Sequence, residues 1–199
     1  MHLAANAVRP NAEDGIARYQ IDAKKSRFTV RAFATGMLSA FGHSPTIAIR
    51  DFDGEVHFTQ TDAALADAGM KLNIRAESFE VTDDIKEKDR QEIQREMQTK
   101  VLETDRFPEI VYECPQATAN GSGGQYTVTL NGELSLHGVT RPAPVSARVT
   151  LNGDSMRAAG EFSIRQSDYD IAPVTAVAGT IKLKDELKFS FEIVARKQE

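Results

Sequence analysis

The feature that most constrains the fold of this chain is an alternation of apolar and polar residues with a period of two. In RFTVRAF, residues 27–33, Phe28, Val30 and Ala32 share one parity and alternate with Arg27, Thr29 and Arg31. Successive side chains of a strand point to opposite faces, so this pattern is typical of strands with one buried face. The same alternation recurs in the segments 55–58, 69–76, 110–114, 126–136, 145–151, 161–164 and 187–193.

The connections between these segments are rich in Gly, Asn and Asp, as in NGSGG (residues 120–124) and NGDS (152–155). Such residues form tight turns between antiparallel strands. Many strands with one apolar face must either stack as two sheets or close into a barrel, because an open sheet would leave that face in water. The sequence therefore predicts an all-β protein.

One segment, residues 83–105, departs from this period. Its apolar residues Ile85, Ile93, Met97 and Val101 are spaced by multiples of four, and the remainder is strongly charged. This spacing predicts an amphipathic helix with a narrow apolar stripe. We expect the helix to pack across a mouth or a side of the strand layer; a movable lid is the functional alternative.

Composition indicates a single globular domain of 199 residues, with 41% hydrophobic residues and a net charge of −5. We expect a flexible N-terminal arm over residues 1–18 and one domain over residues 19–199. The basic residues are scattered rather than clustered, which argues against nucleic acid as a partner. The one cysteine, Cys114, excludes an intrachain disulfide.

No segment approaches the ~20 apolar residues that a membrane-spanning helix needs, so we expect any membrane contact to be peripheral. The first residues lack the basic and apolar regions of a signal peptide. As written, the chain is therefore expected in the cytoplasm, or in the periplasm if a leader has been removed.

The sequence predicts no catalytic residues, no metal site and no cofactor. It contains no H-x-H or H-x-x-x-H spacing for a metal and no G-x-S-x-G nucleophile motif. His137 lies at the end of a predicted strand beside Gly138, where an imidazole most simply donates a hydrogen bond to the backbone. His43 lies in a predicted loop, where it could contact a ligand headgroup, and His57 is expected to face solvent.

Several motifs occur in a familiar order: YQID (19–22), SRFTV (26–30), FDGEV (52–56), RFPEIVYE (106–113), LNGELSLHGVTRP (130–142) and FSIRQSDYDI (162–171). Through them the chain resembles the YceI-like family. The resemblance implies an antiparallel, lipocalin-like β-barrel of about eight strands with one inserted amphipathic helix. It also implies binding of polyisoprenoid lipids, and it makes a homodimer one option.

The chain departs from the family pattern in three places. Residues 33–50 contain a Gly-rich interruption, the R-x-x-H-L pattern is absent from the helix, and Asp170 stands where glycine is common. These differences fall where a pocket mouth would be, so the ligand could differ.

From the alternation alone a filled core is the simpler interpretation, because any β-sandwich shows the same pattern; the resemblance favours a cavity instead. The predicted ligand-binding residues are Phe28, Val30, Phe58, Met70, Leu72, Tyr112, Leu134, Leu136, Phe162, Phe189, Phe191 and, in the loop, His43.

The resemblance and the alternation together predict a non-enzymatic protein that binds or transports a long apolar lipid, of polyprenyl or quinone type, or a fatty amphiphile. One alternative is an enzyme that acts on such an amphiphile with His43 or His137 as base. The other is an interaction module with a filled core. Arg106, Arg141 and Arg165 could pair with an anionic headgroup such as a pyrophosphate, although strand-end pairing or a solvated position is the simpler role for each.

Overall fold

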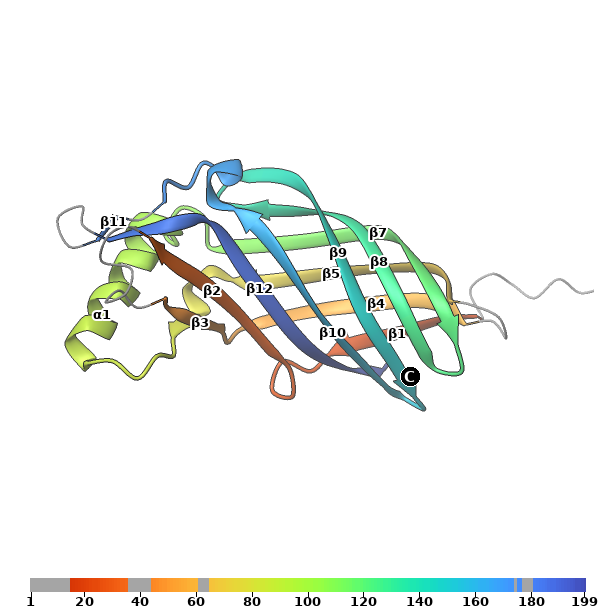
Figure 1. Ribbon diagram of the computed structural model, residues 1–199. Coiled ribbons are helices and arrows are strands. Elements are labelled where there is room, and N and C mark those ends of the chain that lie inside the picture. The colour runs from red at the N-terminus through yellow and green to blue at the C-terminus, as the bar shows by residue number, and fades with distance from the viewer. Residues whose placement is uncertain (1–14, 36–43, 61–64, 174, 177–180) are drawn as a thin grey trace, which may run out of the picture.

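The structure, a computed structural model, describes residues 15–35, 44–60, 65–173, 175–176 and 181–199. In this part of the chain, antiparallel strands close into a barrel with eight strand positions around its circumference, which we call walls. One helix lies at one end of the barrel (Figure 1). The predicted fold class is therefore confirmed. The C-terminus lies at the end of the barrel opposite the helix (Figure 1).

The strands are β1 (Ile16–Ile21), β2 (Arg27–Thr35), β3 (Thr46–Ile49), β4 (Phe52–Gln60), β5 (Leu65–Arg75), β6 (Phe79–Val81), β7 (Glu109–Ser122), β8 (Gln125–Leu136), β9 (Val139–Asn152), β10 (Ser155–Arg165), β11 (Thr175–Ala176) and β12 (Ile181–Lys197). The first strand starts before Tyr19, the residue at which we expect the domain to begin.

Three of the eight walls consist of two short strands in succession. β1 and β2 follow one another along β12, with Ile21 facing Ala195 and Arg27 facing Glu192. On the other side, β1 pairs with β4 and β2 pairs with β3. β4 and β3 together form the second wall. β5, which pairs with β4, and β6, which pairs with β3, form the third.

The remaining five walls are the continuous strands β7, β8, β9, β10 and β12, which pair in that order. Pairing of β1 with β12 closes the ring. Closure removes most of the exposed strand edges that an open sheet would present. In the described part of the chain, β6 ends the pairing order and keeps an outer edge that no strand pairs with.

The period of two determines which side chains enter the barrel. Along β2 the buried residues are Phe28, Val30 and Ala32, while Arg27 and Arg31 are exposed. At one point a large side chain requires a glycine on the neighbouring strand: a Cβ on Gly132 of β8 would lie 2.6 Å from the hydroxyl of Tyr112 on β7.

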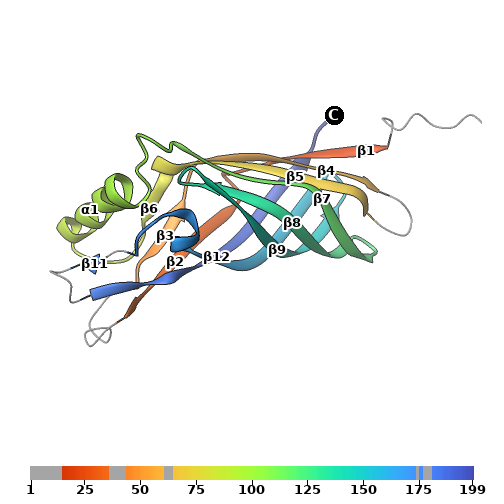
Figure 2. The ribbon, with the colours of Figure 1, turned by 90° about the horizontal axis from the view of Figure 1, so that it is seen from above.

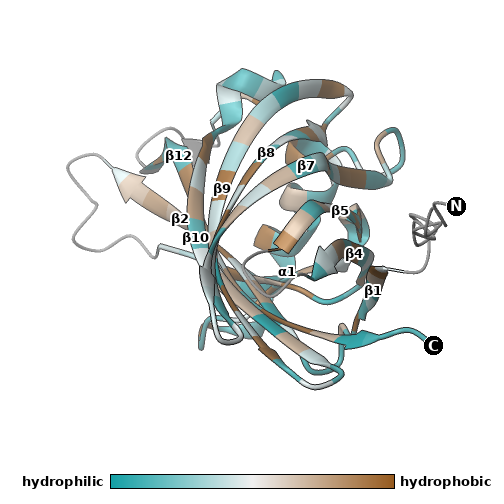
Figure 3. Ribbon diagram, turned by 90° about the vertical axis from the view of Figure 1, so that its right-hand side faces the viewer, coloured by the Kyte–Doolittle hydropathy of each residue, from teal (hydrophilic) through white to brown (hydrophobic). Residues whose placement is uncertain are grey.

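The helix α1 runs from Glu87 to Glu96 and continues as a π-helical turn, η2 (Met97–Val101), which the Leu102 N–H closes on the Met97 carbonyl at 2.8 Å. It lies at the end of the barrel beside β6 (Figures 1 and 2). Seen along the barrel from the opposite end, the strands surround the interior and α1 lies behind it (Figure 3). Of the two positions that we expected, across a mouth or along a side of the barrel, the structure shows the first.

No helix in the described ranges is both long and apolar enough to cross a membrane.

Candidate functional site

The barrel encloses a cavity of about 770 Å³. Inward-facing residues of the barrel strands line it, and α1 and η2 complete the wall at one end with Ile93, Met97 and Val101. Its volume lies within the ~300–1,000 Å³ that is common for small-molecule sites. The interior is hollow, which disagrees with the filled-core alternative.

The structure brings together all the predicted ligand-binding residues that it describes. They line the cavity from seven strands: Phe28, Val30, Phe58, Met70, Leu72, Tyr112, Leu134, Leu136, Phe162, Phe189 and Phe191. His43 lies outside the described residues. The position of these side chains is thus established, and their contact with a ligand stays a prediction.

Phenylalanine rings form a cluster on one side of the cavity. Phe162 stacks on Phe189 with ring centroids 4.8 Å apart, and Phe28 meets Phe191 edge to face at 6.1 Å. Phe162 and Phe191 are only half-buried, so their rings expose surface to the cavity. An apolar chain would gain its binding energy by covering such surface.

Among the described residues outside α1, the polar side chains that line the cavity are neutral. The Tyr112 hydroxyl donates to the Leu130 carbonyl at 3.3 Å and accepts from the Gly132 N–H at 3.2 Å. Burial raises its pKa to about 12, so it stays protonated at neutral pH. Gln166, which is 2% exposed, donates from Nε2 to the Lys184 carbonyl at 3.0 Å.

Charged residues reach the cavity wall at the α1 end alone, within the described part of the chain. They are three carboxylates, Asp89, Glu92 and Glu96, which follow one another along α1 beside Ile93. We did not predict them from the sequence, because charged residues of an amphipathic helix usually face solvent. Asp89, Glu92 and Glu96 lie three or four residues from one another or from Ile93, which places all of them on one face of the helix. This spacing is the signal that could have identified them.

The three arginines considered for an anionic headgroup do not line this cavity. Arg106 pairs with Glu103, whose pKa it lowers by a hydrogen bond, and its guanidinium lies over the Phe107 ring. Arg141 donates from Nε to the Asp168 carbonyl at 3.3 Å.

His137 occupies the two-residue turn between β8 and β9, with φ of 53°, followed by Gly138 with φ of 77°. Its Nδ1 donates to the Tyr169 carbonyl at 3.3 Å, and its ring packs on Phe107. Its Nε2 lies 3.5 Å from a Glu103 carboxylate oxygen. His137 does not line the cavity, so the interpretation as a strand-end imidazole is confirmed and a base acting on a bound lipid finds no support.

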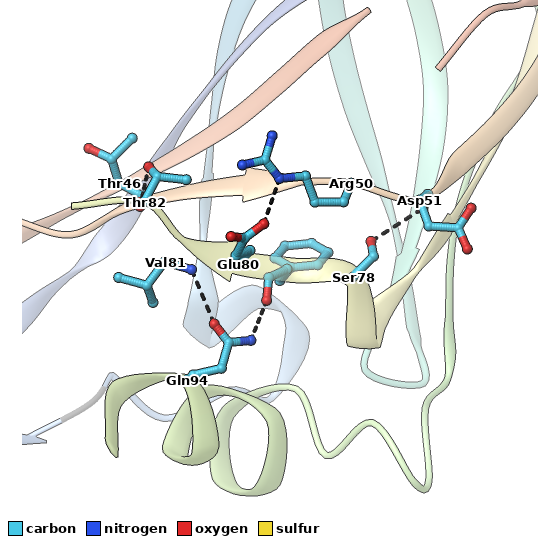
Figure 4. Close-up of polar contacts among 9 residues, drawn as sticks. Thr46, Arg50, Asp51, Ser78, Glu80, Val81, Thr82 and Gln94 are labelled. Atoms are coloured by element: carbon cyan, nitrogen blue, oxygen red, sulfur yellow. Dashed lines mark hydrogen bonds and ion pairs between the residues drawn. The ribbon is translucent and has the colours of Figure 1, made fainter. Parts of the chain in front are cut away.

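Gln94 attaches α1 to the barrel at the outer edge of β6 (Figure 4). Its carboxamide accepts from the Val81 N–H at 3.1 Å and donates to the Phe79 carbonyl. A neighbouring strand would bond these same two groups, so one side chain satisfies a short stretch of strand edge. One turn further along, Gln98 donates to the Glu77 carbonyl at 3.2 Å.

Replacing Gln94 by alanine is expected to loosen α1, because it leaves two partly buried backbone groups without a partner, at a cost of about 1–3 kcal/mol. Amide hydrogen exchange in residues 87–101 should speed up roughly tenfold or more, as judged by mass spectrometry of peptides from this segment. Gln91→Ala is the control, because Gln91 bonds to Glu87 within the helix. Equal acceleration in both variants would contradict this role of Gln94.

Among the described residues, no group of three or more His, Cys, Asp or Glu side chains is arranged to hold a metal ion. Cys114 is fully buried but is not among the residues that line the cavity, and burial raises the pKa of its thiol.

The profile of the YceI-like domain matches residues 19–195. A UPF0312 protein from Pseudomonas savastanoi pv. phaseolicola (strain 1448A / Race 6) is 27% identical over 175 residues, which cover 83% of this chain and 82% of that protein. A UPF0312 protein from Pseudomonas syringae pv. syringae (strain B728a) has the same identity and coverage.

Solved structures share the fold. Burkholderia cenocepacia BcnA superposes with a TM-score of 0.67 at 19% identity, covering 87% of this chain and 98% of its own. A polyisoprenoid binding domain from Saccharophagus degradans, implicated in plant cell wall breakdown, gives 0.62 at 15%, covering 90% and 98%. The Campylobacter jejuni YceI protein gives 0.56 at 14%, covering 77% and 85%.

Proposed function

The chain belongs to the YceI-like family, and from that premise we propose that it binds one long apolar lipid, of isoprenoid type, inside the barrel without chemically changing it. The observation that carries the proposal is the 770 Å³ cavity with its largely apolar wall. The structural relative from Saccharophagus degradans, a polyisoprenoid binding domain, supports the ligand class.

The size of the cavity suits a lipid chain of medium length. If each carbon-sized group occupies about the 30 Å³ of a water molecule in the liquid, the cavity holds about 25 such groups. This corresponds to about five isoprene units, and a longer chain would fold back or extend beyond the mouth. Burial contributes about 0.8 kcal/mol per CH₂, which gives tight binding without hydrogen bonds to the tail.

A carrier fits the described residues better than an enzyme. Apart from the three carboxylates of α1, the described cavity wall offers hydroxyl, amide and aromatic groups, and the Tyr112 hydroxyl stays protonated at neutral pH. Transport, homodimerisation and the cellular compartment stay predictions.

The first test is gentle purification followed by native mass spectrometry and solvent extraction. We expect one co-purifying lipid per chain, with an isoprenoid or quinone released into the solvent. If the protein is purified empty, it should take up geranylgeraniol and release bound Nile red. A chain that carries no lipid and binds neither the dye nor a prenyl alcohol would overturn the proposal in favour of an interaction module.

A further inference from the structure

One part of the cavity wall does not belong to the sheet. In the described part of the chain β6 pairs with β3 alone, and residues 82–108, which we call the helical segment, leave the sheet before β7 begins. Met97, Val101 and Leu102 of this segment line the cavity. A ligand that enters or leaves at this end of the barrel must displace them.

The helical segment is attached to the barrel on two sides. On one side, Gln94 and Gln98 bond to backbone groups of residues 77–81 (Figure 4). On the other side, Glu103 contacts His137 in the turn between β8 and β9. The first attachment consists of neutral amide groups, whereas both members of the second can carry a charge. Of these two attachments, the second is therefore the one that can respond to pH.

The His137 imidazole faces an oxygen acceptor with each of its nitrogens. Nδ1 lies 3.3 Å from the Tyr169 carbonyl oxygen, and Nε2 lies 3.5 Å from Oε1 of Glu103. A neutral imidazole has one N–H group, so one of its nitrogens must face an oxygen without a proton between them. In the described part of the chain, Nε2 is buried and makes no hydrogen bond.

Protonation removes this mismatch, because the imidazolium ring carries two N–H groups and can donate to both oxygens. The Tyr169 carbonyl keeps its hydrogen bond from Nδ1, and the Glu103 carboxylate gains a charge-assisted one from Nε2. Nε2 and Oε1 need to approach by only a few tenths of an ångström to form it. The geometry of the closed segment therefore suits the charged form of His137.

The charges around His137 balance one another before it gains a proton. The charged or titratable residues that contact it, or that contact its partners, are Glu103, Arg106, Arg141, Asp168 and Tyr169. A hydrogen bond from Arg106 lowers the pKa of the Glu103 carboxyl, which stays charged in mildly acidic solution. Burial raises the pKa of Tyr169, whose hydroxyl stays neutral. Between about pH 5.5 and 7.5, imidazole is the side chain type that normally changes its charge.

We propose that His137 is a proton-gated latch: when it is protonated, its imidazolium binds Glu103 and holds the helical segment against the β8–β9 turn. At higher pH the neutral ring releases Glu103, and the segment opens more often. The direction follows from linkage, because a proton that binds more tightly to the closed segment stabilises closure at low pH, and this stabilisation is lost as the pH rises. The latch itself stands without a ligand; its effect on ligand exchange rests on the lipid-binding function proposed above.

Hydrogen exchange of the full-length, lipid-free protein tests the latch directly. Exchange rates of peptides from residues 97–107 are measured at pH 5.5 and 7.5 and divided by the intrinsic rate at each pH, so that the quotient reports opening of the segment. Opening should be about fivefold or more rarer at pH 5.5, as expected for one added charge-assisted hydrogen bond. Peptides from β9 should differ by less than about twofold. Equal opening of the segment at the two pH values would overturn the proposal.

Two variants and a control assign the effect to this pair of residues. His137→Asn should abolish the pH dependence, because asparagine tolerates the φ of 53° and keeps an amide donor but gains no proton. Glu103→Gln should abolish it as well, because the imidazolium then has no carboxylate to bind. The control is His2→Asn/His43→Asn/His57→Asn, which leaves His137 as the sole histidine of the chain and should keep the full difference. A pH dependence that survives in His137→Asn, or that disappears in the control, would contradict the assignment.

Release of bound Nile red then connects the latch to ligand exchange. Dissociation followed by stopped-flow fluorescence should be slower at pH 5.5 than at pH 7.5 by about the same fivefold factor, and the difference should disappear in His137→Asn. Equal release rates at the two pH values would refute the effect on ligand exchange. Failure of the dye to bind at either pH would instead contradict the lipid-binding function, while hydrogen exchange would still decide whether the latch exists.

Discussion

Replacing Phe58 by alanine is expected to lower the free energy of unfolding by about 3–5 kcal/mol, the usual range for removing a fully packed phenylalanine. Phe58 is 1% exposed and stacks on Tyr19 with ring centroids 5.2 Å apart. Tyr19 lies on β1, and β1 both pairs with β4 and closes the barrel against β12. The substitution therefore removes packing where the first wall meets the last. Urea denaturation followed by circular dichroism measures the change.

Phe162→Ala is the matched control for this prediction. Phe162 also lines the cavity, but it is only half-buried, so part of its ring already lacks packing partners. Its removal should cost roughly half as much, because less apolar contact is lost and the cavity is merely enlarged. An equal cost for the two variants would show that the ring of Phe162 is packed as tightly as that of Phe58.

The second large effect concerns binding. Ala147 is 5% exposed and lines the cavity from β9. In Ala147→Trp the indole should occupy roughly the space of five methylene groups of the ligand, each contributing about 0.8 kcal/mol. Lipid affinity should therefore fall about 100-fold to 1,000-fold. The chain has no tryptophan of its own, so the new fluorophore also reports directly on the polarity inside the barrel.

Ser146→Trp is the control for the blocking variant. Ser146 is the preceding residue of β9 and is exposed on the outer face. It should leave Nile red and geranylgeraniol binding within about twofold of the original protein, because strand neighbours point to opposite faces. Strong binding by Ala147→Trp with a blue-shifted indole emission would mean that the lipid lies elsewhere.

The long walls were predictable from the sequence because their alternation extends over many residues. The short strands β3 and β6 were not, since four and three residues are too few to show a period. Their pairing depends on β2, which supplies the partner for β3. The helix was predicted as well, but not its passage into a π-helical turn at Met97, because that depends on hydrogen bonds rather than on spacing.

Part of the candidate site was predictable from the sequence, and part was not. Parity identified the cavity wall, and a position beside glycine identified the structural role of His137. The carboxamide of Gln94 could not be found, since nothing in the sequence indicates that β6 has a free edge. Asp170 gains an explanation: its φ of 56° lies in the left-handed region, where glycine is favoured, which agrees with the glycine that is common there in the family.

The pairing of β1 with β12 has a consequence for biosynthesis. This contact joins parts of the chain as far apart as Gln20 and Gln198, whose side chains are 178 positions apart and hydrogen-bonded at 3.1 Å. Contacts between such distant residues form slowly. During translation the ring stays open until β12 has left the ribosome, and the apolar faces of the earlier strands remain exposed until then. The nascent chain therefore passes through an aggregation-prone interval that ends when its final strand docks.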